Sequence, residues 1–163
     1  MTGHGGTLLG NSPLERADTG RMGKGMTKLT LENMFDAENA ANGLLEAAKV
    51  RRLELEGLVD TGATTLVIPA DAAVALGLRE IRRKKARVAD GRAVEFAVVT
   101  GLRLAIFGRE MTCDALVAPV GMPVLIGQIP LEALDLIVDP KSQEARPNAA
   151  HPDGPVYEIL RAC

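Results

Sequence analysis

Aromatic side chains are almost absent from this sequence of 163 residues, which contains three Phe, one Tyr and no Trp. Because 47% of the residues are nevertheless hydrophobic, a packed core has to consist of Val, Leu, Ile and Ala. The formal net charge is −2, from 19 basic and 21 acidic residues. This near-neutral balance gives no general attraction to nucleic acid or to an anionic membrane, so neither is an expected partner.

Cysteine, histidine and long hydrophobic runs are also scarce. Cys113 and Cys163 are not in a C-x-x-C spacing, and the two histidines, His4 and His151, lie near opposite ends. A structural zinc site needs four well-spaced ligands, so we expect no metal and no other cofactor. No apolar run approaches the roughly 18 residues of a membrane helix. Reduced cysteines and the lack of a signal-peptide core predict a cytoplasmic protein.

The first 25 residues differ in composition from the rest. They contain seven glycines, scattered charges and no hydrophobic periodicity. This composition is typical of disorder. We therefore expect residues 1–25 to form a disordered tail and residues 26–163 to form one domain.

The remaining pattern predicts a mainly β, or all-β, domain with one or two short helices. Asp90-Gly91 between two β-prone runs is a strong hairpin signal. Pro69 and Gly77 bracket a short helix. The strands are expected at 28–32, 50–59, 64–68, 85–89, 93–99, 102–107, 111–117, 124–126, 136–138 and 156–160. Short helices are expected at 69–76 and 130–134, and a short helix or helical loop at 36–50.

The segment Leu58-Val59-Asp60-Thr61-Gly62-Ala63 is the chemically informative one. Two apolar residues end a strand, and an acid follows them directly. Gly62 lets the chain turn so that backbone N–H groups can approach the carboxylate. Asp-Thr-Gly is also ordinary turn chemistry, which is the alternative interpretation. An acid between two core strands is costly without a partner or a use, which favours a functional role for Asp60.

The sequence resembles the retropepsin-like aspartic proteases, and most closely their bacterial stand-alone members. Residues 58–67 resemble the catalytic segment of that family, and Val124-Leu125-Ile126-Gly127 resembles its second signature. The hairpin at 89–92 falls between them, where the family carries its flap. The resemblance implies a single-lobe, closed β-barrel subunit.

The resemblance also implies an aspartic endopeptidase that works as a homodimer, because the chain has one Asp-Thr-Gly and the site needs two carboxylates. Asp60 of each copy would share a proton and activate a water molecule. Thr61 would stiffen the loop across the dimer axis, and Gly62 would approach the substrate backbone. An extended polypeptide substrate would be contacted by Ala63, Asp90, Gly91 and Ile126.

One departure from the viral members concerns a buried ion pair. Viral members usually carry an acid and an Arg at the positions of Thr64 and Gln128, which are both neutral here. This difference leaves open how the dimer is held. It also keeps two alternatives open: a non-catalytic, dimeric peptide-binding module of the same fold, and an unrelated β-barrel scaffold with Asp60 in a plain turn.

Three further features have simpler interpretations. The basic run at 79–87 could contact nucleic acid or an acidic peptide, but a solvated edge strand kept from aggregating by charge is the favoured interpretation. Asp139, followed by Pro140, is interpreted as a turn residue and not as a second catalytic acid. Cys113 is interpreted as a buried apolar filler.

Overall fold

The computed structural model describes residues 25–157 and residue 159. The predicted disorder of residues 1–25 falls almost entirely outside this part. The described elements are β1 (Met26–Asn33), α1 (Met34–Ala41), the 3-10 turn η1 (Ala47–Lys49), β2 (Arg52–Val59), β3 (Leu66–Pro69), α2 (Ala70–Ala75), β4 (Arg79–Arg87), β5 (Ala93–Ile106), β6 (Arg109–Ala118), β7 (Val124–Ile126), α3 (Gln128–Ala133), β8 (Leu136–Val138) and β9 (Ala145–Pro147).

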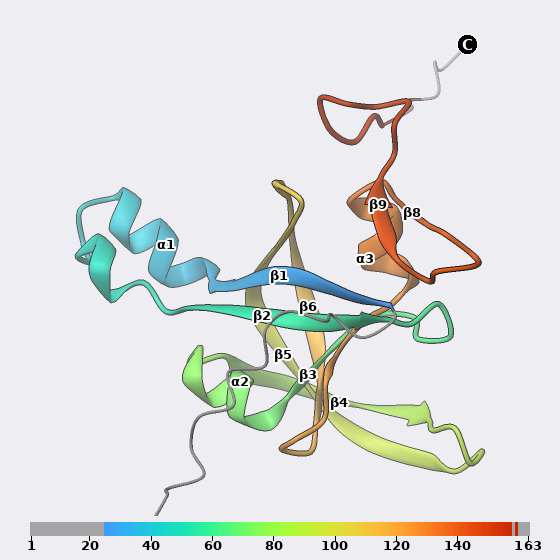
Figure 1. The fold of residues 1–163 in the computed structure, drawn as a ribbon. Coiled ribbons are helices and arrows are strands. Elements are labelled where there is room, and N and C mark those ends of the chain that lie inside the picture. Colours follow the sequence, from blue (N-terminus) through green and yellow to red (C-terminus); the bar gives the residue numbers. More distant parts are fainter. Residues whose placement is uncertain (1–24, 158, 160–163) are drawn as a thin grey trace, which may run out of the picture.

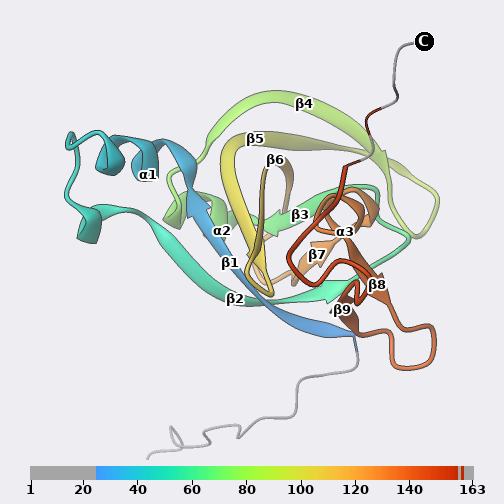
Figure 2. The same ribbon diagram turned by 90° about the horizontal axis from the view of Figure 1, so that it is seen from above.

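Six strands close into a barrel in the order β1-β2-β7-β3-β6-β5, and pairing of β1 with β5 completes the ring (Figures 1 and 2). The seventh strand, β4, pairs with β5 outside the ring. The short strands β8 and β9 form a separate two-stranded sheet near α3. The prediction of a mainly β, retropepsin-like closed barrel is confirmed, and its described part contains three short α-helices where one or two were expected.

The barrel interior is aliphatic, as the scarcity of aromatic residues predicts. Its fully buried members come from strands on all sides of the ring and include Leu31, Leu66, Leu104 and Ile126, each with 0% exposure. Alternation along β1 puts Leu29 and Leu31 into this core, as expected for a strand with one buried face. Each such side chain stabilises the fold by about 1.5–3 kcal/mol through burial.

Strand β7 is only three residues long but lies between two other core strands. It runs parallel to β2, with Val59 opposite Ile126, and antiparallel to β3, with Val67 opposite Leu125. The ends of β2 and β7 therefore reach the same end of the barrel. This arrangement brings the loop after β2 and the loop after β7 together.

The hairpin of β4 and β5 is confirmed, and it is longer than expected. β4 begins at Arg79, and the run 102–107 is not a separate strand but the second half of β5. A bulge between Val99 and Leu102 holds Gly101 at φ +81°, so the strand bends and continues instead of ending. The basic run forms an exposed edge strand, so its predicted place at the edge of the sheet is confirmed.

Other boundaries also shift. The segment 36–50, expected as a short helix or helical loop, contains most of α1, then a loop and η1, and the strand expected at 64–68 runs from Leu66 to Pro69. The terminal strand expected at 156–160 is wrong at its described residues, since Val156, Tyr157 and Ile159 are in no strand. A β-prone run needs a partner strand before it can form a strand itself. The available partner, β8, pairs with β9, a strand that the sequence pattern did not predict.

An ion pair between Asp36 and Arg51 holds together the two ends of the helical segment between β1 and β2. Both carboxylate oxygens of Asp36 accept hydrogen bonds from the Arg51 side chain, at 2.6 and 2.8 Å. These bonds hold the pKa of Asp36 below its ordinary value. Asn33 caps α1 by accepting the Asp36 N–H, and its amide donates to the Leu76 carbonyl at 2.8 Å. The start of α1 is therefore tied to the end of α2.

A second polar cluster fastens the chain after β9 to the barrel. The guanidinium of Arg109, only 7% exposed, donates to the carbonyls of Leu134, Asp135 and His151. The Asp135 carboxylate accepts from Asn148 at 2.9 Å and contacts His151 Nδ1 at 2.6 Å. The amide of Asn148, and then His151 and Arg109, hold the pKa of Asp135 below its usual range.

Asp139 has the turn role that the sequence predicts. Its carboxylate accepts the backbone N–H groups of Lys141 and Ser142 and the side chain of Arg146. Those backbone hydrogen bonds lower the pKa of Asp139.

Of the helices in the described part of the chain, none is both long enough and apolar enough to cross a membrane.

Candidate active site

Asp60 is the first residue after β2, at the end of the barrel where β2 and β7 finish together. Its backbone N–H donates to the Ile126 carbonyl at 3.0 Å, which extends the parallel ladder by one step. Its own carbonyl accepts the Ala63 N–H at 3.1 Å, which closes a tight turn. The backbone of Asp60 is thereby held from both sides, as expected for a residue that must present a side chain precisely.

The carboxylate of Asp60 is oriented by the glycine of the same turn. Its Oδ1 atom accepts the Gly62 N–H at 2.9 Å. Asp60 is partly exposed, and no ion pair within the described residues involves it. One oxygen is therefore fixed while the carboxylate as a whole is not neutralised by a cation of the same chain. It can accept or donate a proton.

The loop after β7 locks the loop after β2 in place. A Cβ atom on Gly127 would lie 2.4 Å from the Thr65 carbonyl oxygen and 2.7 Å from that of Ala63, so only glycine fits this approach. Just beyond it, the N–H groups of Gln128 and Ile129 donate to the carbonyls of Ala63 and Thr64, at 2.9 and 3.0 Å. These contacts join the start of α3 to the Asp60 loop.

The structure brings most of the sequence-predicted site residues together, with different degrees of exposure. Thr61 and Gly62 are exposed beside Asp60, and Ala63 is half-buried. Ile126 is fully buried in the core, so in this chain its contribution to the site is the carbonyl that receives the Asp60 N–H. Contact of its side chain with a substrate stays a prediction.

Asp90 and Gly91 lie apart from the Asp60 loop, at the tip of the β4–β5 hairpin. The Asp90 carboxylate accepts from the backbone and side chain of Arg92, and Gly91 adopts φ +85° in the turn. In both ribbon views the hairpin tip projects beyond the barrel on the side where β2 ends (Figures 1 and 2). Their role in covering a substrate stays a prediction.

The positions of the viral ion pair are linked here through the backbone. Thr64 and Gln128 are both exposed, so neither side chain leaves a buried charge without a partner. The hydrogen bonds from Gln128 N–H to Ala63 and from Ile129 N–H to Thr64 join the same two segments. A charged pair is therefore not needed to hold these loops together within one chain.

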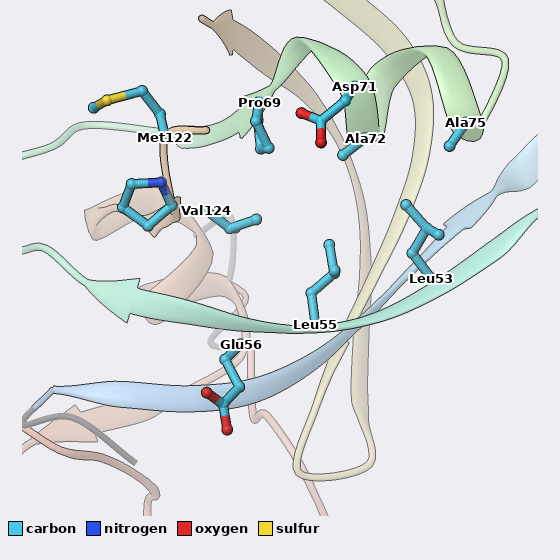
Figure 3. A pocket seen from close by; sticks show the side chains of 10 residues that line it. Leu53, Leu55, Glu56, Pro69, Asp71, Ala72, Ala75, Met122 and Val124 are labelled. Carbon is cyan, nitrogen blue, oxygen red and sulfur yellow. The ribbon is translucent and has the colours of Figure 1, made fainter. Parts of the chain in front are cut away.

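A pocket of about 300 Å³ lies elsewhere on the barrel, against the first half of β2. Leu53 and Leu55 point from β2 towards α2, and Met122 and Val124 lie nearby, whereas the Glu56 carboxylate points away (Figure 3). The pocket forms where β2 has not yet met β7. Its lining does not include Asp60, so it is separate from the candidate active site.

Asp60 presents a single carboxylate, which the Gly62 N–H orients. No group of three or more His, Cys, Asp or Glu side chains that could hold a metal ion occurs in residues 25–157. One oriented carboxylate can act as a base or as an acid, but it cannot do both in the same step. Chemistry that needs both roles requires a second titratable group.

Comparison with known proteins places this geometry in a family. A family model described as "gag-polyprotein putative aspartyl protease" matches residues 47–133, which is more than half of the chain. The chain belongs to this family. The matched range runs from η1 to the end of α3. It therefore contains Asp60, the tip of the β4–β5 hairpin and Gly127, which packs against the backbone of Thr65.

Other comparisons add little. Among solved structures, the EIAV protease complexed with the inhibitor HBY-793 matches at 24% identity and a TM-score of 0.40, over 48% of this chain and 75% of that chain. A search of curated proteins finds no match.

Sequence reasoning missed the cluster around Arg109, which fixes the chain beyond α3. An arginine after a hairpin glycine is usually a solvated residue, and its burial follows only from the three-dimensional position of the 148–151 segment. Gly127 was recognised as part of a motif, but its contact with Thr65 is visible only in the fold.

Proposed function

We propose that this chain is an aspartic endopeptidase that acts as a homodimer, with one Asp60 carboxylate contributed by each subunit. The observation that carries the proposal is the carboxylate itself: it is oriented by Gly62, has no cationic partner in the described chain, and ends a strand of an aspartyl protease-family barrel. A scaffold turn would not need Gly127 packed against the backbone of the neighbouring loop.

The need for two subunits follows from counting acids. The chain has a single Asp-Thr-Gly, and Asp139 is engaged in its own turn, far along the sequence. Hydrolysis by an activated water needs one group to take a proton and another to give one. A closed two-fold dimer would supply the second carboxylate as Asp60 of the partner.

The proposed mechanism uses a proton shared by the two carboxylates. Two carboxyl groups in contact do not both ionise easily, so the pair holds one proton and titrates as a unit. The ionised Asp60 takes a proton from a water molecule, and that water attacks the scissile carbonyl. The protonated Asp60 of the other subunit polarises the carbonyl and donates its proton to the carbonyl oxygen as the tetrahedral intermediate forms. The first Asp60 then passes the proton it took from water to the amide nitrogen, the C–N bond breaks, and the second Asp60 takes back a proton from the intermediate's hydroxyl as the carboxylic acid and the amine form, so the pair again holds one proton. No covalent intermediate with the enzyme forms.

Substrate recognition would use backbone pairing. The exposed Thr61-Gly62 turn would lie below the substrate, and the Asp90-Gly91 tip would close over it. An extended polypeptide between these elements can hydrogen-bond as an added strand. Thr61 would contact the partner loop, and Ala63 and Ile126 would border the substrate side chains.

Two finer points belong to the same proposal. The neutral Thr64 and Gln128 support a bacterial-type member over a viral-type one. The free thiol of Cys113 fits a reducing compartment such as the cytoplasm.

The direct test is cleavage of a mixed peptide library between about pH 3.5 and 7, a range set by dyad chemistry. Wild type and Asp60→Asn are compared at equal concentration, and sedimentation records the oligomeric state of each. We expect cleavage by wild type alone and a dimer for both proteins. A strictly monomeric wild type at micromolar concentration would refute the shared site.

The same experiment separates the alternative of a non-catalytic, dimeric peptide-binding module. The neutral Thr64 and Gln128 favour that alternative to the extent that they weaken the viral type of interface. Dimers of wild type and of Asp60→Asn that both capture library peptides, with cleavage by neither, would support it.

A further inference from the structure

The outer edge of the β4–β5 hairpin combines an unpaired sheet edge with a high density of positive charge. β4 is the last strand of its sheet, so within residues 25–157 one side of its backbone has no partner strand. At roughly 3.3 Å per residue, its nine residues offer an edge of about 30 Å. Six of these nine residues are basic: Arg79, Arg82, Arg83, Lys84, Lys85 and Arg87.

The register identifies the backbone groups that face outward. The Val88 N–H donates to the Arg92 carbonyl at 2.9 Å, so alternate residues from Val88 backwards bond to β5. The residues between them, Arg83, Lys85 and Arg87, lie in the non-hydrogen-bonded pairs and direct their N–H and C=O groups away from β5. This outward row is the pattern that an added strand requires.

The charges of the strand are only partly neutralised within the described chain. Arg82 pairs with Asp114, and Arg83 pairs with Glu80 and lies 4.0 Å from Glu95. Lys84 and Lys85 form no ion pair within residues 25–157. A protein of net charge −2 thus concentrates nearly a third of its 19 basic residues on one exposed strand.

We propose that the free edge of β4 is a docking site for an acidic, extended polypeptide segment, which adds to the sheet as a further strand. Opposite charges on directly facing residues stabilise neighbouring strands, and like charges destabilise them. A second copy of β4 would oppose six basic residues with six more, so the charge excludes self-pairing and selects a strand rich in Asp and Glu.

The arrangement of the charges favours a peptide over nucleic acid. Arg82 and Lys84 lie on one face of the strand, and Arg83, Lys85 and Arg87 lie on the other. The basic residues therefore line one edge of the sheet but do not gather on one of its faces. Glu80, Glu95 and Asp114 lie among them and would repel phosphates. β4 does not contain Asp60, and the proposal does not require proteolytic activity.

The test is fluorescence anisotropy of a labelled ten-residue peptide that alternates Glu and Thr, titrated with the full chain. The matched comparison peptide has Lys in place of every Glu. A third peptide keeps the acidic sequence but is N-methylated at alternate residues, which removes its strand-pairing N–H donors. A single-stranded oligonucleotide of equal charge is the fourth probe.

The protein variants are matched in net charge. Lys84→Glu/Lys85→Glu reverses two charges on the edge, and Lys49→Glu/Lys141→Glu reverses two exposed charges elsewhere. We expect the edge variant to bind the acidic peptide about tenfold or more weakly, since two attractions become repulsions, and the control variant to bind nearly as wild type. Asp60→Asn should bind as wild type does.

We also expect binding to weaken between about 50 and 500 mM NaCl and to be lost with the N-methylated peptide. No binding of the acidic peptide at up to about 1 mM protein at low salt would overturn the proposal. So would equal binding by the edge variant, equal binding of the N-methylated peptide, or preferential binding of the oligonucleotide. Loss of cleavage activity in Asp60→Asn leaves this result unaffected, so the two proposals fail separately.

Discussion

Gly127 lies so close to Thr65 that a Cβ atom on the glycine would be 2.4 Å from the Thr65 carbonyl oxygen. The contact is between two backbone segments, so no flexible side chain can move aside. It joins the loop after β7 to the loop that begins at Asp60, and it makes the position of the carboxylate depend on a residue 67 positions further along the chain.

The first prediction concerns the two glycines of the site. Gly127→Ala should destabilise the protein by about 1–3 kcal/mol in urea unfolding, because the loops must separate to admit the methyl group. Gly62→Ala is the matched comparison, since its Cβ would meet only Asp60 Oδ1, at 3.2 Å. We expect it to keep nearly full stability but to lose activity. Equal stability of Gly127→Ala and wild type would contradict the packing described above.

The second prediction concerns Arg109, the buried guanidinium that holds the chain beyond β9. Arg109→Lys should lower the free energy of unfolding by about 3 kcal/mol, because a single ammonium cannot serve the carbonyls on both sides of the guanidinium. It should also speed limited proteolysis within residues 148–157. Arg146→Lys, an exposed partner of Asp139, is the control and should change little. Unchanged proteolysis of Arg109→Lys would show that this segment is fixed by other contacts.

The third prediction concerns stability in acid. The pKa values of Asp36, Asp135 and Asp139 are all lowered in the folded protein, by Arg51, by Asn148, and by the backbone N–H groups of Ser142 and Lys141 respectively. A carboxyl with a lowered folded pKa stabilises the fold fully above its unfolded pKa, near 3.9, and this contribution disappears as pH falls through the folded value.

The urea midpoint should therefore be nearly constant from about pH 7 to 5 and should fall below about pH 4. Asp139→Asn should make that fall shallower, whereas Asp153→Asn, an exposed control, should not. A midpoint that rises on acidification would mean that these carboxylates do not stabilise the fold. The experiment also sets the acid limit below which peptide cleavage no longer reports on folded protein.

The fourth prediction concerns the thiol of Cys113. Burial, with a smaller effect of Asp114, raises the pKa of Cys113 to about 11. At pH 8 its thiolate is correspondingly rare, so reaction with a disulfide reagent should be about a hundredfold or more slower than for an ordinary thiol. The measurement uses Cys163→Ser, which leaves Cys113 as the single cysteine, with and without urea. Cys113 is only partly buried against the core, and rapid reaction of the folded protein would contradict even this partial burial.

The parts of this fold that follow from local pattern were predictable from the sequence. The Asp90-Gly91 turn, the strand 124–126 and the acid at the end of β2 each depend on a few adjacent residues, and the structure has them where the pattern indicates. The split of the segment after β1 was not predictable, because it depends on Asp36 meeting Arg51 across 15 positions.

The errors have the same physical origin. β5 continues through Gly101 because β6 and β1 supply partners on either side, whereas Val156 and Tyr157 have strand-like residues but no partner strand in the described chain. Pairing, and not intrinsic preference, decided both cases. The burial of Arg109 likewise depends on the 148–151 segment, which no motif marks.

The central claim, that one active site is shared by two copies of Asp60, is tested most directly by mixing subunits. Wild type at a fixed concentration is combined with a threefold excess of Asp60→Asn, allowed to exchange, and assayed for peptide cleavage. Random pairing leaves about a quarter of the wild-type subunits in fully wild-type dimers, so the account predicts that activity falls to roughly a quarter. Activity that stays at the level of wild type alone would show that each chain works with its own Asp60, and would contradict the account.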